Sequence, residues 1–400
     1  MTGSAEILEQ WLARFEAALE DPSLAGVADL FDATCYWRDM VAFTWNIKTM
    51  EGQDAISAML AETLSHVQPG GWTLEGEASE ADGAIGGWFS FETRAGTGKG
   101  HVRLKDGKCW TLLTTLTNLT DHPFKEGPAR SRGVEHGAHA GKKHWGERRR
   151  QEIEEIGTTR QPYCLIIGGG QGGMALAARF AHLDVPALIV DKHERPGDSW
   201  RTRYESLCLH DPVWYDHMPY IPFPDGWPVF TPKDMMADWL EMYARVMQLN
   251  YWSATTCTKA SYNQDLGQWA VTVDRGGTSH TLHPSHLVFA TGMSGYPQVP
   301  KFPGRELFSG EQLHASKYRT GAPFAGKRCV VIGSNTSAHD ICADLWEHGA
   351  DVTMVQRSGS LVVQTETVLD RVLGPLYSEE ALAAGIDMET ADYMSTTWPH

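Results

Sequence analysis

Two stretches of the chain repeat one pattern of apolar and polar positions. In each, a short apolar run leads into a glycine-containing turn, then into a segment with the apolar spacing of a helix, and then into a second apolar run. The first stretch begins at residues 163–167 and the second at residues 328–332. Short apolar runs around a helical period predict strand–turn–helix–strand units with parallel strands. The sequence therefore predicts an α/β fold with two Rossmann-like dinucleotide-binding domains.

The first turn is rich in glycine. Gly168 allows a tight turn, Gly170 lets the backbone approach a pyrophosphate, and Gly173 lets helix and strand pack closely. Asp191 ends the next apolar run, 23 residues after Gly168 (191 minus 168), where a carboxylate can accept hydrogen bonds from ribose hydroxyls. We interpret this unit as the FAD site.

The second turn differs from the first at chemically informative positions. Asn335 replaces the middle glycine and Ala338 the last, and Asn is a residue that tolerates left-handed backbone angles. Gln356 stands 23 residues after Gly333 (356 minus 333), at the place of the carboxylate, and Arg357 follows it. A guanidinium without a neighbouring carboxylate suits the 2'-phosphate of NADPH. The alternative is an ordinary surface arginine after a strand.

The first 125 residues have a different pattern. An amphipathic opening and a helical stretch near 54–63 precede strand-like runs at 88–93, 100–104 and 109–116, which turn residues separate. A polar segment rich in Gly and His follows and lacks an apolar period, so we interpret it as a linker. The predicted division is 1–125 for a small α+β domain, 126–160 for the linker, 161–305 for the FAD-binding domain and 306–400 for the NADPH-binding domain.

Charge and cysteine content narrow the function classes. The chain has 50 acidic and 34 basic residues and a net charge of -16, which disfavours nonspecific nucleic-acid binding. Its seven cysteines are dispersed and include no CxxC pair, and His136, His139 and His144 lack zinc-type spacing, so no metal site is predicted. No run of 18 apolar residues occurs. We expect a soluble cytoplasmic protein that binds small molecules and neither nucleic acid nor membrane.

Several further motifs give the chain a family resemblance from about residue 160 onward. Residues 308–318 resemble the FxGxxxHxxx(Y/W) sequence that identifies flavin-containing monooxygenases, just before the second turn. Residues 290–292 (ATG), 197–200 (GDSW) and 207–212 (LCLHDP) also resemble this family, the last one its plant auxin-forming branch. The N-terminal domain is similar to NTF2-like or SnoaL-like cone folds.

The resemblance implies FAD and NADPH as cofactors and assigns their ligands. Gly168, Gly170, Gly173, Asp191 and Trp200 are assigned to FAD, and Ser334, Asn335, Ser337 and Arg357 to NADPH. The other predicted cofactor-binding residues are Gly172, Lys192, Ser199, His210, Ala290, Thr291, Gly292, Tyr318 and Gly333. His210 is the catalytic candidate, at the junction of flavin and NADP, and a purely structural hydrogen-bonding role is its equal alternative. We expect Tyr318 to shape the hinge between the domains rather than to react.

The resemblance also implies the reaction. NADPH would reduce FAD, O2 would add to give a C4a-(hydro)peroxyflavin, and a small soft nucleophile would be oxygenated at sulfur, nitrogen or an activated carbon such as that of an indole or a 2-oxo acid. Baeyer-Villiger oxidation of ketones to esters is the nearest alternative. A noncatalytic nucleotide-binding or scaffold protein is the alternative from another class. A flavin disulfide reductase is disfavoured because the chain lacks a CxxC pair.

Two features depart from the family or leave alternatives open. In the family the chain returns after the NADPH domain to complete the FAD domain, so we expect an incomplete FAD domain and a truncated NADPH domain here. In the N-terminal domain, Trp37, Arg38, Asp39 and His66 are candidates for lining a cone pocket. The alternative is an inert fold used for packing or for contacts in a homodimer.

Overall fold

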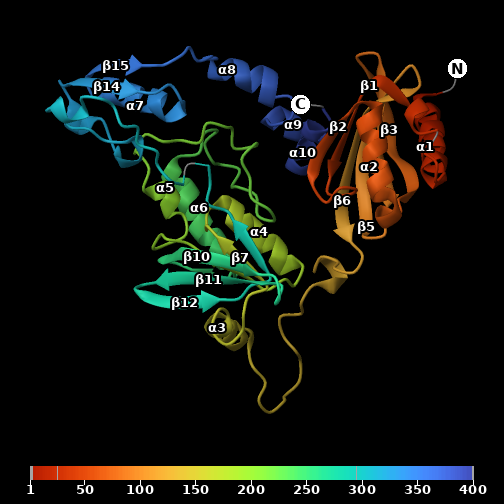
Figure 1. Ribbon diagram of the computed structural model, residues 1–400, viewed down its shortest axis with the longest axis horizontal. Coiled ribbons are helices and arrows are strands. Elements are labelled where there is room, and N and C mark those ends of the chain that lie inside the picture. Colours follow the sequence, from red (N-terminus) through yellow and green to blue (C-terminus); the bar gives the residue numbers. More distant parts are fainter. Residues whose placement is uncertain (1–2, 25, 294, 399–400) are drawn as a thin grey trace. The chain divides into compact units, whose positions relative to one another are not determined.

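The computed structural model describes residues 3–24, 26–293 and 295–398, and Figure 1 shows its ribbon. The chain forms two compact units: the residues up to Ala129 together with those from Glu380 on, and Arg130–Glu379. The predicted division placed all of 306–400 in one NADPH-binding domain. The structure differs because Tyr393 and Thr397 contact the sheet of the first unit.

The first unit is built on one six-stranded sheet with the strand order β2-β1-β6-β5-β4-β3. Neighbouring strands are antiparallel except β1 and β6, which are parallel. Its elements before residue 130 are α1 (Ser4–Glu20), η1 (Ala28–Leu30), β1 (Phe31–Met40), β2 (Ile47–Glu51), α2 (Gly52–Val67), β3 (Gly70–Ala81), β4 (Ala84–Glu92), β5 (Gly96–Lys105), β6 (Lys108–Leu119) and η2 (Gly127–Ala129). Those after residue 378 are α9 (Glu379–Ala383) and α10 (Met388–Thr396).

Aromatic rings fill the space between this sheet and helices α1 and α2. Strand β5 makes room for two of them with glycine, because a Cβ at Gly98 or Gly100 would lie 2.2 Å from the ring of Phe91 or Phe89. The buried rings of this core are those of Trp11, Phe15, Phe31, Trp37, Phe43, Trp72, Phe89 and Phe91. These closely packed side chains fill the interior of the unit.

The predicted cone pocket is therefore wrong in its residues. Trp37 is fully buried among other rings, and Asp39 is fully buried with its carboxylate bonded to the protein. Arg38 donates to Thr49, and His66 is exposed on α2. A groove of about 600 Å³ lies instead between β2 and α2, lined in part by Lys48 and Met59.

The Asp39 carboxylate holds the loop after β1. It accepts hydrogen bonds from the N–H groups of Phe43 and Thr44 and from the hydroxyls of Thr44 and Thr114. In this loop Val41 has φ 59, an uncommon conformation for a β-branched residue. The buried carboxylate thus stabilises a strained connection.

We expect Asp39→Ala to lower the free energy of unfolding of this unit by about 2–4 kcal/mol, because it leaves buried donors without an acceptor. Urea titration would measure the loss. Asp32→Ala is the matched control, since the described bond of the Asp32 carboxylate is a local one from the Thr34 N–H, and it should cost less than about 1 kcal/mol. Equal losses for the two variants would contradict the role of Asp39.

The second unit contains parallel and antiparallel sheets. A four-stranded parallel sheet has the order β13-β7-β8-β9, a three-stranded antiparallel sheet is β10-β11-β12, and β14 and β15 form a parallel pair. Its first elements are α3 (Trp145–Glu155), β7 (Cys164–Ile167), α4 (Gln171–His182), β8 (Ala187–Val190), α5 (Asp198–Arg201), α6 (Lys233–Val246), β9 (Tyr251–Trp252), β10 (Thr255–Asn263), β11 (Gln268–Arg275), β12 (Thr278–Leu282) and β13 (His286–Phe289). Then come η3 (Arg305–Leu307), η4 (Ala315–Lys317), η5 (Ala322–Phe324), β14 (Arg328–Ile332), α7 (Thr336–Glu347), β15 (Asp351–Val355), α8 (Thr365–Val368) and a π-helical turn, Leu369–Leu373. The predicted α/β class is confirmed as a mixed α/β fold with parallel and mixed sheets.

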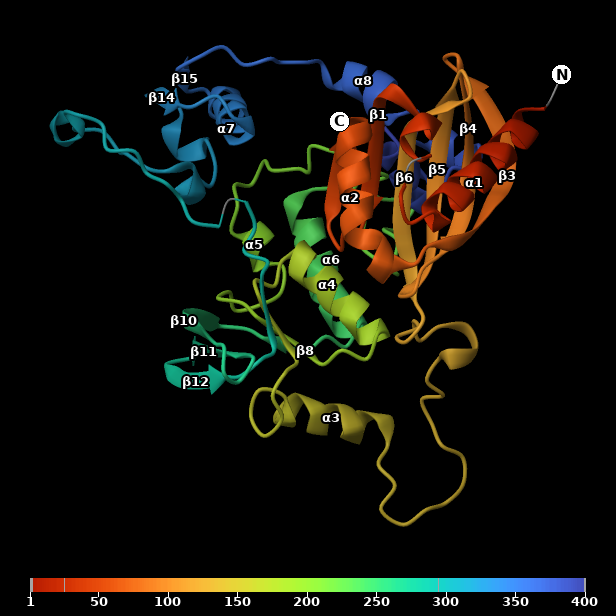
Figure 2. The same ribbon diagram turned by 45° about the vertical axis from the view of Figure 1, so that its right-hand side comes forward.

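The first parallel sheet is buried on both faces. Successive side chains of a strand point to opposite faces, so Ile166 and Ile189 join the core formed with α4 and α6, whereas Leu165 and Leu188 join a second core with β11 and β12. Figures 1 and 2 both show α4 and α6 side by side. Burial on both faces explains why these strands are continuous apolar runs rather than alternating ones.

The predicted linker is wrong at its carboxyl end, where α3 forms. Its amino end has a capping box between His144 and Glu147. Arg149 then donates to the Asn250 side chain and to the Leu249 carbonyl, at 2.7 and 2.9 Å. Polar side chains thus hold α3 against the second unit, which is why no apolar period marked it.

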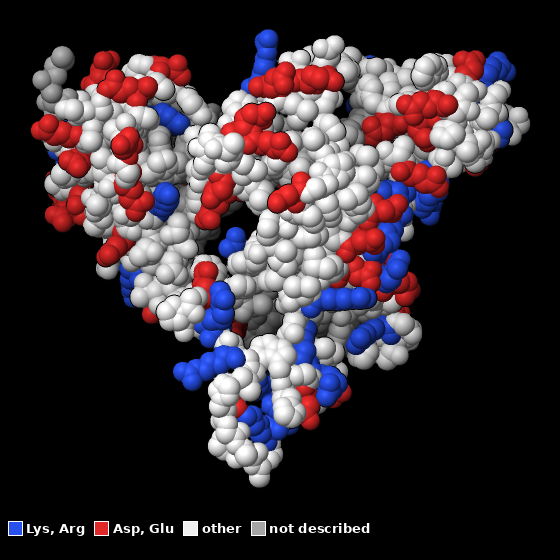
Figure 3. Space-filling model, turned by 180° about the vertical axis from the view of Figure 1, so that it is seen from behind, with Lys and Arg blue, Asp and Glu red and all other residues white. Residues whose placement is uncertain are grey.

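Acidic and basic side chains are unevenly distributed. In the view of Figure 3, Lys and Arg side chains gather over the region of α3 and the segment before it, and acidic side chains predominate over the N-terminal unit. No described helix is long and apolar enough to cross a membrane. Within the described residues no group of three or more His, Cys, Asp or Glu side chains is arranged to hold a metal ion.

Candidate nucleotide-binding site

The first glycine turn joins β7 to α4, and two of its glycines are required by the protein itself. Gly168 has φ +111, and a Cβ there would lie 2.2 Å from the Ala290 carbonyl oxygen. A Cβ at Gly173 would lie 2.0 Å from the Gly168 carbonyl oxygen. These positions need glycine for backbone angle and packing whether or not a ligand binds.

Gly170 is different, because the protein does not require its glycine. Its angles, φ -80 and ψ -171, suit any residue, and a Cβ would meet nothing within 4 Å. The same space is open at Gly172. Open space therefore lies next to the Gly170 Cα, beside the amino end of α4. Backbone N–H groups at a helix amino end favour an anion. This is a cradle that a pyrophosphate fits.

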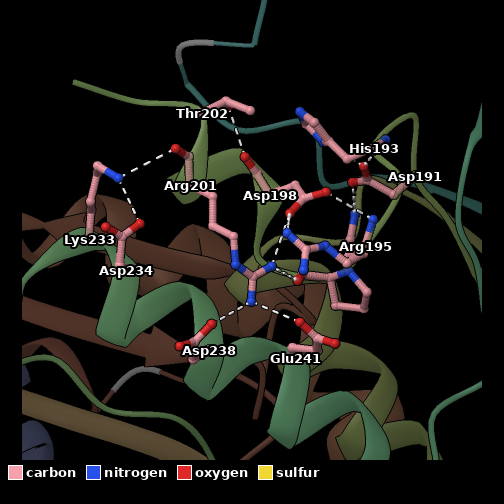
Figure 4. A network of polar contacts seen from close by, with 12 residues as sticks. Asp191, His193, Arg195, Asp198, Arg201, Thr202, Lys233, Asp234, Asp238 and Glu241 are labelled. Carbon is pink, nitrogen blue, oxygen red and sulfur yellow. Dashed lines mark hydrogen bonds and ion pairs between the residues drawn. The ribbon is translucent and has the colours of Figure 1, made fainter. Parts of the chain in front are cut away.

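Asp191 lies directly after β8 and bonds to the glycine turn. Figure 4 shows Asp191 beside His193. Its Oδ2 accepts from the Gly169 N–H at 2.6 Å, and its Oδ1 accepts from the His193 N–H at 2.8 Å. His193 Nδ1 lies 2.7 Å from the same Oδ1. Sequence reasoning missed His193, although a carboxylate often bonds the backbone two residues on.

Tyr251 closes the inner side of the turn. Its hydroxyl donates to the Gly169 carbonyl at 3.2 Å. Burial, together with the charge of Asp191, raises the pKa of Tyr251. The hydroxyl therefore stays protonated and serves as a donor that fixes the turn.

An arginine clamp holds the segment after Asp191. Arg201 donates to Asp198 at 2.9 Å and, from α5 to α6, to Asp238 and Glu241 at 2.7 and 2.8 Å (Figure 4). The clamp positions Trp200, whose indole N–H lies 3.3 Å from the side-chain oxygen of Gln171 at the start of α4. Trp200 is thus next to the first turn, whereas the predicted ligands Ser199 and Lys192 are exposed.

The strand β13 and the residues after it lie across the turn. The Ala290 N–H donates to the Ile167 carbonyl at 2.8 Å, which places Ala290 against the end of β7. Thr291 and Gly292 continue as an exposed loop in which Gly292 has φ +76. The structure thus brings the predicted residues 290–292 next to Gly168.

His210 connects the two nucleotide regions through a residue that the sequence did not reveal. Its Nε2 lies 3.0 Å from Oδ2 of Asp340, on α7, and the Tyr204 hydroxyl donates to the same oxygen at 2.6 Å. The hydrogen bond to Asp340 raises the pKa of His210. Although burial opposes it, bonding to His210 and Tyr204 lowers the pKa of Asp340 overall.

The pair predicts a pH-dependent stability. Because the pKa of His210 is raised, its contribution is complete below its usual pKa and is lost as pH rises through the raised value; the Asp340 contribution is lost only as pH falls through its lowered value. We expect the Tm of the His210→Gln variant to lie clearly below that of the wild type at about pH 5.5 and close to it at about pH 9. A deficit independent of pH would contradict the ion pair.

The second turn, between β14 and α7, has the same backbone course as the first. The Gly333 N–H donates to the Val355 carbonyl at 2.9 Å, as the Gly168 N–H does to Val190. Asn335 does not use its tolerance for left-handed angles: its φ of -88 and ψ of 170 are extended, like those of Gly170 in the first turn. The side chain instead caps α7 by accepting from the Thr336 N–H at 2.9 Å.

The remaining residues of the second site are spread around this turn. The Ser334 carbonyl accepts from the Ser360 hydroxyl at 3.3 Å, and Ser337 is hydrogen-bonded to Tyr204. Arg357 lies two residues after β15, is exposed, and makes no ion pair within the described part of the chain. Its guanidinium is therefore available to a ligand at the strand end.

Tyr318 is buried rather than open to a cofactor. Its hydroxyl donates to the Asp344 carboxylate, which also accepts from the Gly321 N–H at 2.8 Å. Burial and the Asp344 contact raise the pKa of Tyr318. The ring packs with Tyr204, Ile341 and Leu345, so Tyr318 joins α7 to the segment around Tyr204.

The chain is similar to known proteins over the region that contains the two glycine turns. Residues 165–392 match the family described as Pyridine nucleotide-disulphide oxidoreductase. The chain is 35% identical over 214 residues to the indole-3-pyruvate monooxygenase YUCCA1 of Oryza sativa subsp. japonica, covering 53% of this chain and 52% of that protein. It is 32% identical over 207 residues to the indole-3-pyruvate monooxygenase YUCCA6 of Arabidopsis thaliana, covering 50% and 49%. A solved flavin-containing monooxygenase from Stenotrophomonas maltophilia has a TM-score of 0.47 and 26% identity, covering 56% of this chain and 68% of that one.

The family match includes both glycine turns, Asp191 and Arg357, and it extends over more than half of the chain. It confirms the predicted enzyme class, an oxidoreductase, and supports the predicted cofactor pair of FAD and NADPH. The chain spans about half the length of the curated relatives it matches. On the strength of residues 165–392, the chain belongs to the pyridine nucleotide-disulphide oxidoreductase family.

Proposed function

We propose that the protein is an FAD- and NADPH-dependent monooxygenase that oxygenates a small soft nucleophile. The observation that carries this proposal is the contrast between two similar turns. The first is followed by the carboxylate of Asp191 and the second by the exposed guanidinium of Arg357, which has no ion-pair partner among the residues that the structure describes. A carboxylate suits the free ribose hydroxyls of FAD, and a guanidinium suits the 2'-phosphate of NADPH.

Different residues would bind the two cofactors. FAD would supply the redox and oxygen chemistry, with NADPH as the electron donor. Gly170 leaves space for the pyrophosphate, the amino end of α4 presents N–H groups to it, and Asp191 is placed for the ribose. At the second turn, Asn335 fixes the amino end of α7. His210, bonded to Asp340, joins the segment around residue 210 to α7 of the second turn.

The relatives narrow the substrate class. Two of them are named for indole-3-pyruvate, a 2-oxo acid that carries an indole. We extend to this chain a preference for small molecules with an activated carbon, sulfur or nitrogen. A disulfide-reducing role lacks support, because the seven cysteines are dispersed along the sequence and include no CxxC pair.

The N-terminal unit we assign to the NTF2-like folds. The sheet order β2-β1-β6-β5-β4-β3 and the packing of α1 and α2 on one side of it support this assignment. Since aromatic side chains fill its interior, we assign it no reaction of its own. The FAD-binding region is proposed to begin near residue 161 and the NADPH-binding region near 306.

Product analysis with isotopically labelled O2 tests the function. Purified protein supplied with FAD and NADPH would be incubated with indole-3-pyruvate, a thioether or a cyclic ketone. We expect one labelled oxygen atom in the product from indole-3-pyruvate or from the thioether. Ester formation from the ketone alone would establish the Baeyer-Villiger alternative, and NADPH oxidation that yields only hydrogen peroxide with every substrate would contradict a monooxygenase.

A further inference from the structure

One strand of the N-terminal sheet carries basic side chains on the face away from the aromatic core. Strand β5 alternates strictly, so that Gly98, Gly100, Val102 and Leu104 point to the core. The opposite positions are Lys99, His101, Arg103 and Lys105. Although the chain has a net charge of -16, three of these four outward positions, Lys99, Arg103 and Lys105, are lysine or arginine. Together with Trp88 on β4 and Trp110 on β6, we call these residues the basic face.

The segment around α10 covers this face. Arg103 donates through Nη1 to the Thr397 carbonyl at 2.8 Å and through Nη2 to the Thr397 hydroxyl at 2.7 Å, and its guanidinium carbon lies 4.2 Å from the centre of the Trp398 ring. Thr397 is the C-cap residue of α10. A cation there satisfies a free carbonyl and matches the partial negative charge of the helix end.

Aromatic contacts extend the interface along the helix. The rings of Tyr393 and Trp88 lie 6.3 Å apart, and those of Trp398 and Trp110 6.1 Å apart, both edge to face. Lys99 Nζ lies 5.9 Å from the Tyr393 ring. In Figure 2 the blue C-terminal segment lies behind the sheet, with α1 and α2 in front.

Charge complements these contacts. The segment contains the acidic residues Asp387, Glu389 and Asp392, and Asp387 is close enough to Lys99 for the two charges to interact. Hydrogen bonds from the Thr390 backbone and side chain lower the pKa of Asp387, and the charge of Lys99 adds to the effect. Beneath the interface, burial and the neighbouring Arg103 lower the pKa of His101 to about 3, so that His101 is neutral and Arg103 and Lys99 carry the charge.

We propose that the basic face of the N-terminal unit is a docking surface for an acidic helix, that its occupant is the α10 segment of the same chain, and that Arg103 is the anchoring residue. The N-terminal unit then serves the oxidoreductase by holding the chain that continues from Arg357 and the second turn. This role differs from that of an independent ligand-binding domain. Because the α10 segment covers the basic face, this face does not bind a second copy of the chain.

Hydrogen–deuterium exchange on the whole protein tests the proposal. We expect Arg103→Ala to speed exchange of the α10 amides about tenfold or more, because two charge-assisted bonds to the helix end are lost. Arg38→Ala is the matched control, since Arg38 is a half-buried arginine of the same sheet that bonds Thr49 instead. It should leave α10 exchange unchanged.

A variant on the helix side excludes damage to the sheet as the cause. Trp398→Ala removes a ring that is 41% exposed and lies outside the core of the unit, and it should speed α10 exchange while β5 and β6 keep theirs. Arg103→Lys should give an intermediate rate, because it keeps the charge without the fork. The proposal is overturned if α10 exchanges equally fast in the wild type, Arg103→Ala and Trp398→Ala, or if Arg103→Ala changes the mass of the assembly rather than the exchange of α10.

Discussion

Gly170→Val is expected to yield a folded protein that does not retain FAD. Valine is compatible with the backbone angles φ -80 and ψ -171, and its Cβ would meet no protein atom within 4 Å. The added methyl groups would occupy the space that a pyrophosphate needs beside the amino end of α4. We expect the affinity for FAD to fall by about 100-fold or more, the effect of losing two charge-assisted hydrogen bonds. Flavin absorbance after desalting, together with circular dichroism, measures both properties.

Two other glycines make this test specific. Gly226→Val is the matched control, because this exposed position also has open space around its Cβ and should keep both fold and flavin. Gly173→Val should instead lose the fold, since its Cβ would lie 2.0 Å from the Gly168 carbonyl oxygen. If Gly170→Val stays as yellow as the wild type, the pyrophosphate does not bind at this turn.

Arg357→Ala is expected to remove the preference for NADPH over NADH. The guanidinium is exposed at the end of β15, makes no ion pair with the described residues, and so is available to a 2'-phosphate. Its loss should weaken NADPH by about 1–3 kcal/mol, or roughly 5- to 150-fold, and leave NADH nearly unchanged. The measurement is kcat/KM for flavin reduction by each nucleotide.

Arg328→Ala provides the comparison for this variant. Arg328 is also an exposed arginine of the same two-stranded sheet, but it begins β14 and so lies at the opposite end of the strands from the turn. It should leave the ratio of the two nucleotides unchanged. Equal losses for NADPH and NADH in Arg357→Ala would assign Arg357 a structural role.

Local patterns predicted the two nucleotide units well for physical reasons. Strands buried on both faces must be apolar runs. Gly168 has a φ of +111, which favours glycine, and a Cβ at Gly173 would meet the carbonyl of the nearby Gly168. Asp191 follows from the fixed length of the strand–turn–helix–strand unit. These features depend on neighbours close in the sequence, so the sequence alone shows them.

The features that were missed depend on contacts between distant segments. Asp340 meets His210 across 130 residues, and Arg103 meets Thr397 across 294. Helix α3 lacks an apolar face because polar bonds from Arg149 hold it. The Asn335 side chain caps α7, a role that the comparison of the two glycine turns did not reveal. None of these contacts produces a periodic pattern of apolar residues in the sequence.

In the proposed function, FAD binds at the first turn and NADPH at the second. Anaerobic titration of the FAD-loaded protein with NADPH and, separately, with NADH, following the flavin absorbance, examines both sites at once. We expect NADPH to bleach the flavin with an apparent affinity at least about tenfold tighter than that of NADH. A wild-type protein that binds no FAD, or whose flavin responds equally to both nucleotides, would refute this assignment of the two turns.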